Sequence, residues 1–391
     1  NMSLQFIIGS SGAGKTRLLY ESLIRQSIED PESSLIAIVP EQFTMQTQKE
    51  VVCLHPNHGT MNIDIVSFQR LAYRVFEELG VEHLAVLDDM GKSMVLRKVA
   101  SREKKHLGLY AGHLNQTGFI NQLKSMLSEL YQYGIMPKDL RQAREEAKGL
   151  LLKEKLKDLS VIYEAFQEEI SQRFITAEEI LDVLCRVLPQ SEMIKKSVIS
   201  LDGYTGFTPV QYRIVELLMV HARKVVVTIT MDPKAQPFQR GSIHDLFYMG
   251  KEMAFSLDKL AKRHGVEREK DVMLTGLPRR FENSPSLAFI ESHLYRYTDK
   301  ADWKPEKVKI FRALSPAREV AGVCSRIHEL VCEQGVRYRE IAVITGDLPG
   351  YRHEIVKRFQ AEEIPFFMDS KKSILENVMV EFIRAVLEAV R

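Results

Sequence analysis

A glycine-rich stretch near the start of the chain has the residue types and spacing of a phosphate-binding loop. It follows the apolar run Gln5–Ile8 and leads into a segment with helical periodicity, which is the context that the motif G-x-x-x-x-G-K-[ST] requires. Glycines let successive backbone N–H groups turn towards phosphate oxygens, and the helix N-terminus adds partial positive charge. We therefore expect ATP to bind at Gly9, Ser10, Ser11, Gly12, Ala13, Gly14, Lys15 and Thr16.

Two side chains could hold the Mg²⁺ that accompanies ATP. Thr16 offers a hydroxyl, and Asp202 ends the buried strand expected in "VISLDGY", where a carboxylate can reach the metal. The next residue is Gly203, at a position where many motor ATPases carry the carboxylate that orients the attacking water. The sequence therefore predicts an ATP–Mg²⁺ site with weak or absent hydrolysis.

The elements around these residues predict an α/β fold with a parallel sheet and an all-helical insertion. Short apolar runs alternate with helical segments at the start of the chain, and a long stretch with only helical periodicity separates them from later apolar runs. Helix starts are indicated by the capping box that begins at Thr176 and by Thr208 before Pro209. The strands of this domain are expected at 4–8, 33–40, 62–68, 195–204 and 224–232.

A second α/β unit is expected to begin near residue 305. Its helix would run between Ser315 and Gly335, and its strands are expected at 307–314, 338–346 and 364–368. The predicted organisation is thus a first domain at 2–85 and 195–300, a helical insertion at 86–194, and the start of a second domain at 305–391. Asn1 before Met2 and the final helix, which ends without a cap, indicate a piece of a longer protein.

The composition is that of an ordinary globular protein. The 54 basic residues nearly balance the 52 acidic ones, so the net charge of +2 neither requires nor excludes nucleic acid as a partner. The four cysteines form no C-x-x-C pair, which favours reduced thiols over a metal site. We expect a cytoplasmic protein, because the sequence contains no signal peptide and no apolar run of about 18 residues.

Five blocks of sequence carry a resemblance to a known family. In order they are "FIIGSSGAGKT", "AIVPEQFT", "SFQRLAYRVFEELG", "LDGYTGFTPVQYRIVELLMVHA" and "IPFFMDSKKSILENVMVEFIR". They resemble the B subunits of AddAB-type helicase–nucleases, which are similar to superfamily 1 helicases of the UvrD/Rep type. The resemblance implies a RecA-like fold and a role in double-strand-break repair. It also implies DNA and an AddA-type motor subunit as partners, and it places the nuclease and the iron–sulfur cluster beyond this chain.

The resemblance also implies contacts with single-stranded DNA in "EQFTMQT" and "SFQRLAYR". Aromatic side chains there could stack on bases and arginines could meet phosphates. Phe68, however, is spaced with Leu71 and Val75 as a core residue would be, so both interpretations stay open. The candidate DNA-binding residues are Gln42, Phe43, Thr44, Ser67, Phe68 and Arg70.

Three other functions remain open from the sequence. A true DNA-dependent motor would need a catalytic carboxylate elsewhere, and Thr345 stands where such motors often carry an arginine. A phosphotransferase could use the helical insertion as a lid, although no acceptor site stands out. A structural module could bind nucleotide only to hold its fold.

Overall fold

The computed structural model describes residues 2–390, apart from 61, 82–84, 115, 171–173, 233–234, 277, 295–299, 301–303, 305, 307, 369–373 and 375–376. The chain divides into two compact units, Asn1–Glu306 and Lys307–Arg391. Within the described residues, all strands lie in the first unit. No helix described in either unit has the length and apolar character needed to cross a membrane.

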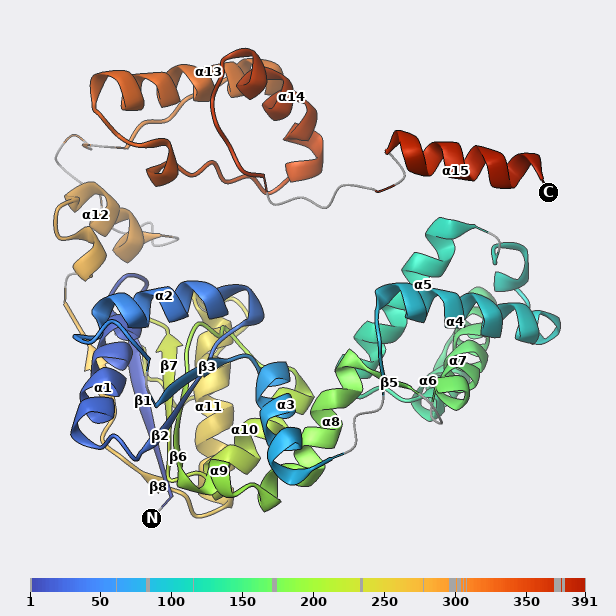
Figure 1. Ribbon diagram of the computed structural model, residues 1–391, viewed down its shortest axis with the longest axis horizontal. Coiled ribbons are helices and arrows are strands. Elements are labelled where there is room, and N and C mark those ends of the chain that lie inside the picture. The colour runs from blue at the N-terminus through green and yellow to red at the C-terminus, as the bar shows by residue number, and fades with distance from the viewer. Residues whose placement is uncertain are drawn as a thin grey trace. The chain divides into compact units, whose positions relative to one another are not determined.

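The first unit is built on a parallel sheet with the strand order β3-β2-β6-β7-β1-β8, and β9 also pairs with β1 (Figure 1). The five strands expected from the sequence are all confirmed. Because parallel strands end at the same edge, this edge brings together the loops that follow them. The strands are β1 (Ser3–Gly9), β2 (Ser34–Ile38), β3 (Ile63–Val66), β6 (Ser197–Leu201), β7 (Lys224–Thr230), β8 (Glu267–Arg268) and β9 (Val272–Leu274).

Helices cover both faces of the sheet (Figure 1). Successive strand residues point to opposite faces, so Ile7 and Val226 belong to one core while Phe6 and Val227 belong to the other. This two-sided burial explains why the strands read as continuous apolar runs. One face carries α1 (Lys15–Glu29) and α2 (Thr44–Leu54); the other carries α3 (Phe68–Leu79), α8 (Ala177–Val187), α10 (Pro209–His221) and α11 (Tyr248–Arg263).

The helical insertion has a core of its own, but it is shorter than expected. Its helices are α4 (Asp89–Arg102), α5 (Thr117–Gln132), α6 (Pro137–Glu146) and α7 (Leu150–Ile170). Two short paired strands, β4 (Ala85–Leu87) and β5 (Phe174–Thr176), lie where the chain enters and leaves it.

The expected boundary at residue 194 is wrong. Ile180 and Leu184 of α8 and Ile194 of α9 (Glu192–Lys196) pack into the core of the sheet. Helical periodicity shows that one face of a helix is buried, but it does not show against which core.

The starts of three helices agree with the sequence signals. Thr176, Thr208 and Ser315 each accept a hydrogen bond from the backbone N–H three residues later, at 3.3, 3.4 and 3.3 Å. Thr176 and Thr208 form complete capping boxes, each with an acceptor side chain at the third helical position. These caps satisfy N–H groups that would otherwise lack a helical acceptor.

The second unit contains α13 (Pro316–His328), α14 (Leu348–Ala361) and α15 (Val378–Ala389). The strands expected at 307–314, 338–346 and 364–368 are wrong, since no residue described there belongs to a ladder. A strand needs a neighbouring strand for its backbone groups. Ile310, Ile344 and Phe367, at 97%, 93% and 91% exposed, show that these apolar segments have not formed a covered sheet.

Candidate functional site

The glycine loop connects β1 to α1 at the carboxyl edge of the sheet. Gly12 and Gly14 have φ angles of 76° and 98°, and Gly14 is the N-cap residue of α1. Side chains rarely adopt this left-handed backbone, so both turns depend on glycine. The loop therefore has the geometry to present backbone N–H groups to an anion at the start of a helix.

Lys15 lies buried at the base of this loop. Its Nζ donates to the carbonyl oxygens of Gly9 at 3.1 Å and Ser10 at 2.8 Å. Burial lowers the pKa of Lys15 to about 8; nearby Asp202 opposes that shift and Arg280 adds to it. The ammonium group is held by two neutral carbonyls, so a phosphate would be a better electrostatic match for it.

Asp202 follows β6 and gathers hydroxyl groups from three residues on two elements. Its Oδ1 accepts hydrogen bonds from Thr16 at 3.1 Å and from Thr228 of β7 at 2.5 Å. Its Oδ2 accepts from the phenol of Tyr20 on α1 at 3.2 Å. The structure thus brings together the two residues that the sequence assigns to a metal, Thr16 and Asp202.

Gly203 has a structural reason to be glycine. Its φ angle is 78°, and a Cβ atom there would lie 3.4 Å from Cδ of Pro40 and 4.0 Å from Cδ2 of Phe43. A carboxylate side chain at this position would combine backbone strain with close contact to the segment after β2. The position where motor ATPases carry a carboxylate is therefore given over to packing between two loops.

Two arginines next to the glycine loop were missed by the sequence reasoning. They belong to η5 (Arg279–Phe281), and the backbone N–H of Arg280 donates to the carbonyl of Gly12 at 3.2 Å. A Cβ atom on Gly12 would lie only 2.9 Å from Cβ of Arg280. The only sequence signal was a pair of adjacent arginines in a loop-like stretch, which does not reveal a contact with a loop so distant in the chain.

The candidate DNA-binding residues divide into two groups. Gln42, Phe43 and Arg70 have exposed side chains, and Phe43 is 43% exposed. The Arg70 guanidinium lies 3.3 Å from the carboxylate of Glu41, and both side chains are more than half exposed. Exposed pairs of this kind contribute little stability, so Arg70 can exchange Glu41 for another anion.

The other three candidates serve the fold. Thr44 donates its hydroxyl to the carbonyl of Glu41 at 3.0 Å, and Ser67 caps α3 through the N–H of Arg70. Phe68 is only 4% exposed, and its ring packs at 5.5 Å from Tyr204 and 6.1 Å from Phe207. Phe68 is therefore a core residue whose ring is not available to stack on a base.

A cleft of about 420 Å³ lies at the carboxyl edge of the sheet, between the loops after β2, β3 and β6 and the end of α5. Its lining is mostly uncharged and includes glutamine and tyrosine side chains, groups that can bond or pack against a polar polymer. The lining residues are Pro40, Glu41, Gln42, Ser67, Phe68, Gln69, Tyr131, Gln132, Leu181, Tyr204, Thr208, Val210 and Gln211.

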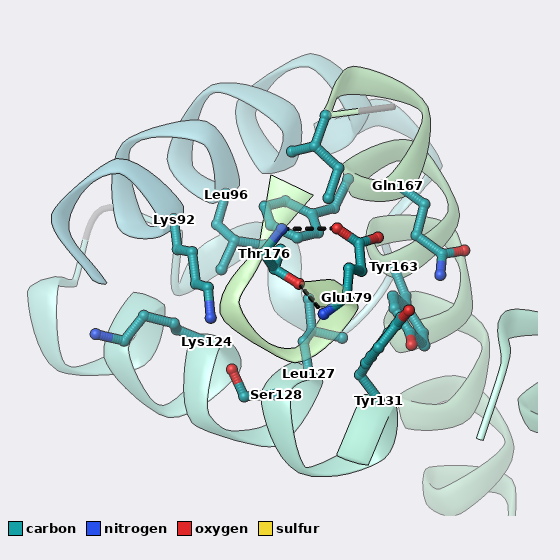
Figure 2. A pocket seen from close by; sticks show the side chains of 12 residues that line it. Lys92, Leu96, Lys124, Leu127, Ser128, Tyr131, Tyr163, Gln167, Thr176 and Glu179 are labelled. Atoms are coloured by element: carbon teal, nitrogen blue, oxygen red, sulfur yellow. Dashed lines mark hydrogen bonds between the residues drawn. The ribbon is translucent and has the colours of Figure 1, made fainter. Parts of the chain in front are cut away.

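A second hollow, inside the helical insertion, is too small to be a ligand site. Figure 2 shows Lys92 and Lys124 on one side of it and the capping box of Thr176 and Glu179 at its centre. Its volume is about 20 Å³, which is room for about one water molecule. The cleft and the glycine loop are therefore the candidate sites.

The comparisons with known proteins place the chain. Residues 6–291 match the family model described as "ADDB, N-terminal". The chain belongs to this family. A relative from Lachnoclostridium phytofermentans, named as the B subunit of an ATP-dependent helicase/deoxyribonuclease, is 41% identical over 100% of the chain. Proteins of the same name from Clostridium novyi and Clostridium acetobutylicum are 34% and 33% identical over 99% of it.

The relatives of this family are much longer than the chain. The chain spans about a third of their length: 34% of the first two and 33% of the third. Their printed names describe a helicase, a deoxyribonuclease and one subunit of an assembly. The site described above is thus the N-terminal portion of what these names cover.

Replacing Gly203 by alanine should destabilise the first unit. A side chain at a φ angle of 78° costs about 1–2 kcal/mol, and the added Cβ would also contact Pro40. The midpoint of thermal unfolding should fall by a few degrees. Gly118→Ala is the matched control, because Gly118 lies in α5 with nothing within 4 Å of its added Cβ. Equal midpoints for the two variants would show that the Gly203 turn is not strained by a side chain.

Proposed function

We propose that the chain is the N-terminal, helicase-like region of one component of a DNA double-strand-break repair helicase–nuclease. It binds ATP–Mg²⁺ at the glycine loop and single-stranded DNA at the neighbouring cleft, with weak or absent hydrolysis. The family and the names of the relatives support the repair role. The parallel sheet, with a glycine loop after β1 and a carboxylate after β6, supports a RecA-like assignment of the first unit.

The observation that carries the nucleotide site is the hydrogen bond between Thr16 Oγ1 and Asp202 Oδ1. It joins the loop to a strand-ending carboxylate 186 residues away in sequence. Mg²⁺ is typically held by one or two carboxylates, waters and the phosphates of its nucleotide, and Thr16 and Asp202 fit this set of oxygen ligands. The bound ion would neutralise phosphate charge, while Lys15 and the loop N–H groups hold the phosphates in place.

The proposal of weak hydrolysis rests on Gly203. The chain needs a group that orients water at the terminal phosphate, and the residue beside Asp202 offers only a hydrogen atom packed towards Pro40 and Phe43. Arg279 and Arg280 add positive charge near the loop, so binding is better equipped than turnover. A robust DNA-stimulated ATPase in the full-length protein without its partner would favour the motor function instead.

The proposed DNA site uses the cleft and the residues beside it. Phe43 presents an exposed ring, Arg70 presents an exchangeable guanidinium, and Gln42 lines the cleft together with Tyr204. Stacking platforms beside cationic groups bind single strands with little sequence preference. The cleft lies at the same sheet edge as the glycine loop, which is where ligands bind in open parallel sheets.

We also propose that the chain acts together with an AddA-type motor protein, because its relatives are named as one subunit of an assembly. The second unit would be part of a second RecA-like domain. Its exposed Ile310, Ile344 and Phe367 support a sheet completed by further chain in the longer protein. The nuclease and the iron–sulfur cluster would lie in that further chain; the four cysteines here are free thiols.

The affinity for ATP–Mg²⁺ should fall as the pH rises above about 8. Lys15 loses its proton near that pH in the free protein, whereas a bound phosphate raises its pKa, so binding at pH 9 should take up close to one proton. Titration calorimetry in two buffers of different ionisation enthalpy measures this uptake. Lys49→Ala, which removes an exposed lysine, should keep it, and Lys15→Ala should abolish binding or the uptake. Affinity that stays constant from pH 7.5 to 9.5 would contradict the role of Lys15.

Removing the ring of Phe43 should weaken binding of single-stranded DNA. The loss of one stacked base is worth about 1–3 kcal/mol, or roughly 5- to 150-fold in affinity. Fluorescence anisotropy with a labelled oligothymidine measures it. Met45→Ala is the matched control, because Met45 is also exposed and apolar but lies outside the lining of the cleft. A similar affinity for both variants would move the DNA site away from this segment.

A further inference from the structure

The phenol of Tyr20 has two hydrogen-bond partners that the proposed function does not use. Its oxygen lies 3.2 Å from Oδ2 of Asp202 and 3.2 Å from Oγ1 of Thr47. A tyrosine hydroxyl carries one hydrogen, so it donates to one of these oxygens at a time. All three residues are buried, and solvent therefore does not supply a competing partner.

The two partners of Tyr20 belong to different functional elements. Asp202 is the carboxylate of the proposed metal site, whereas Thr47 lies on the buried face of α2 with Thr44 and Val51. Tyr20 itself lies one helical turn after Thr16, on the face of α1 that points into the same core. A chain of hydroxyl groups thus runs from the glycine loop through Asp202 and Tyr20 to α2.

The helix α2 is tied to the cleft at its start. The hydroxyl of Thr44 donates to the carbonyl of Glu41, which belongs to η1 (Glu41–Phe43). Glu41 and Gln42 line the cleft, and Phe43 is the exposed ring beside it. A second contact reinforces the connection, because Gly203, the residue after Asp202, packs towards Pro40 and Phe43.

We propose that Tyr20 is a positioning residue that couples the nucleotide site at Asp202 to the DNA-binding segment Glu41–Phe43. The inference rests on the proposed function. In one arrangement Tyr20 donates to Asp202 and accepts from Thr47; in the other it donates to Thr47, whose own hydrogen turns to another acceptor. Asp202 has fewer lone pairs for hydroxyl donors when it ligates a cation, so occupancy of the nucleotide site favours the second arrangement.

The test is the factor by which nucleotide changes the affinity for single-stranded DNA. Anisotropy with labelled oligothymidine, with and without a slowly hydrolysed ATP analogue and Mg²⁺, gives this factor for the whole chain. The wild type should show a change of about fivefold or more, which is the usual lower range for coupled sites. By thermodynamic linkage, DNA should change the affinity for the analogue by the same factor.

Tyr20→Phe keeps the ring and removes only the hydroxyl. It should bring the coupling factor close to one, while each ligand alone binds within about threefold of the wild type. Thr47→Val, which removes the other hydroxyl at constant shape, should have the same effect. Tyr163→Phe is the matched control, because Tyr163 is equally buried but lies in the core of the helical insertion. A purely structural loss would lower the unfolding midpoint without removing the coupling.

The outcomes separate this inference from the function beneath it. A wild type that binds both ligands, together with a Tyr20→Phe variant that keeps the full coupling factor, overturns the role of Tyr20 alone. A wild type that binds both ligands independently also overturns it. A wild type that binds neither analogue nor DNA overturns the proposed function, and this inference with it.

Discussion

The buried carboxylate of Asp202 is the interaction on which the site depends. Three hydroxyl groups, from Thr16, Tyr20 and Thr228, converge on its two oxygens from α1 and β7. Hydrogen bonds to a charged group contribute about 1.5–3 kcal/mol each, and a buried carboxylate without them would be costly. Asp202 therefore fixes the glycine loop to the end of β6, and everything placed at this edge of the sheet inherits that geometry.

Gly203 sets the limit on what this geometry can do. Its left-handed backbone lets the chain turn immediately after Asp202 and pack the turn near Pro40 and Phe43. The same turn leaves no side chain to orient water, so the fold joins the nucleotide loop to the cleft at the position where a motor would place its catalytic carboxylate. Binding of nucleotide and contact with DNA are favoured in this arrangement over turnover.

The sequence predicted what is encoded locally. The glycine loop, the strand ending at Asp202 and the caps at Thr176, Thr208 and Ser315 are each specified by a few adjacent residues, and the structure contains them. Contacts between distant segments were not predictable in this way. Arg280 reaches Gly12 across most of the first unit, α8 packs on the sheet rather than on the insertion, and Phe68 turns its ring into the core. The second unit differs most, because a strand pattern becomes a strand only when another strand pairs with it.

The most direct test of the role of Asp202 is the dependence of ATP affinity on Mg²⁺ in the wild type and in Asp202→Asn. Binding of a fluorescent ATP analogue would be measured with Mg²⁺ and with EDTA, and the isosteric amide keeps the volume of the side chain. The account predicts that Mg²⁺ tightens binding to the wild type by about tenfold or more, equivalent to about 1.4 kcal/mol, and that Asp202→Asn loses this gain while keeping its affinity in EDTA. An equal gain from Mg²⁺ in the variant would contradict it.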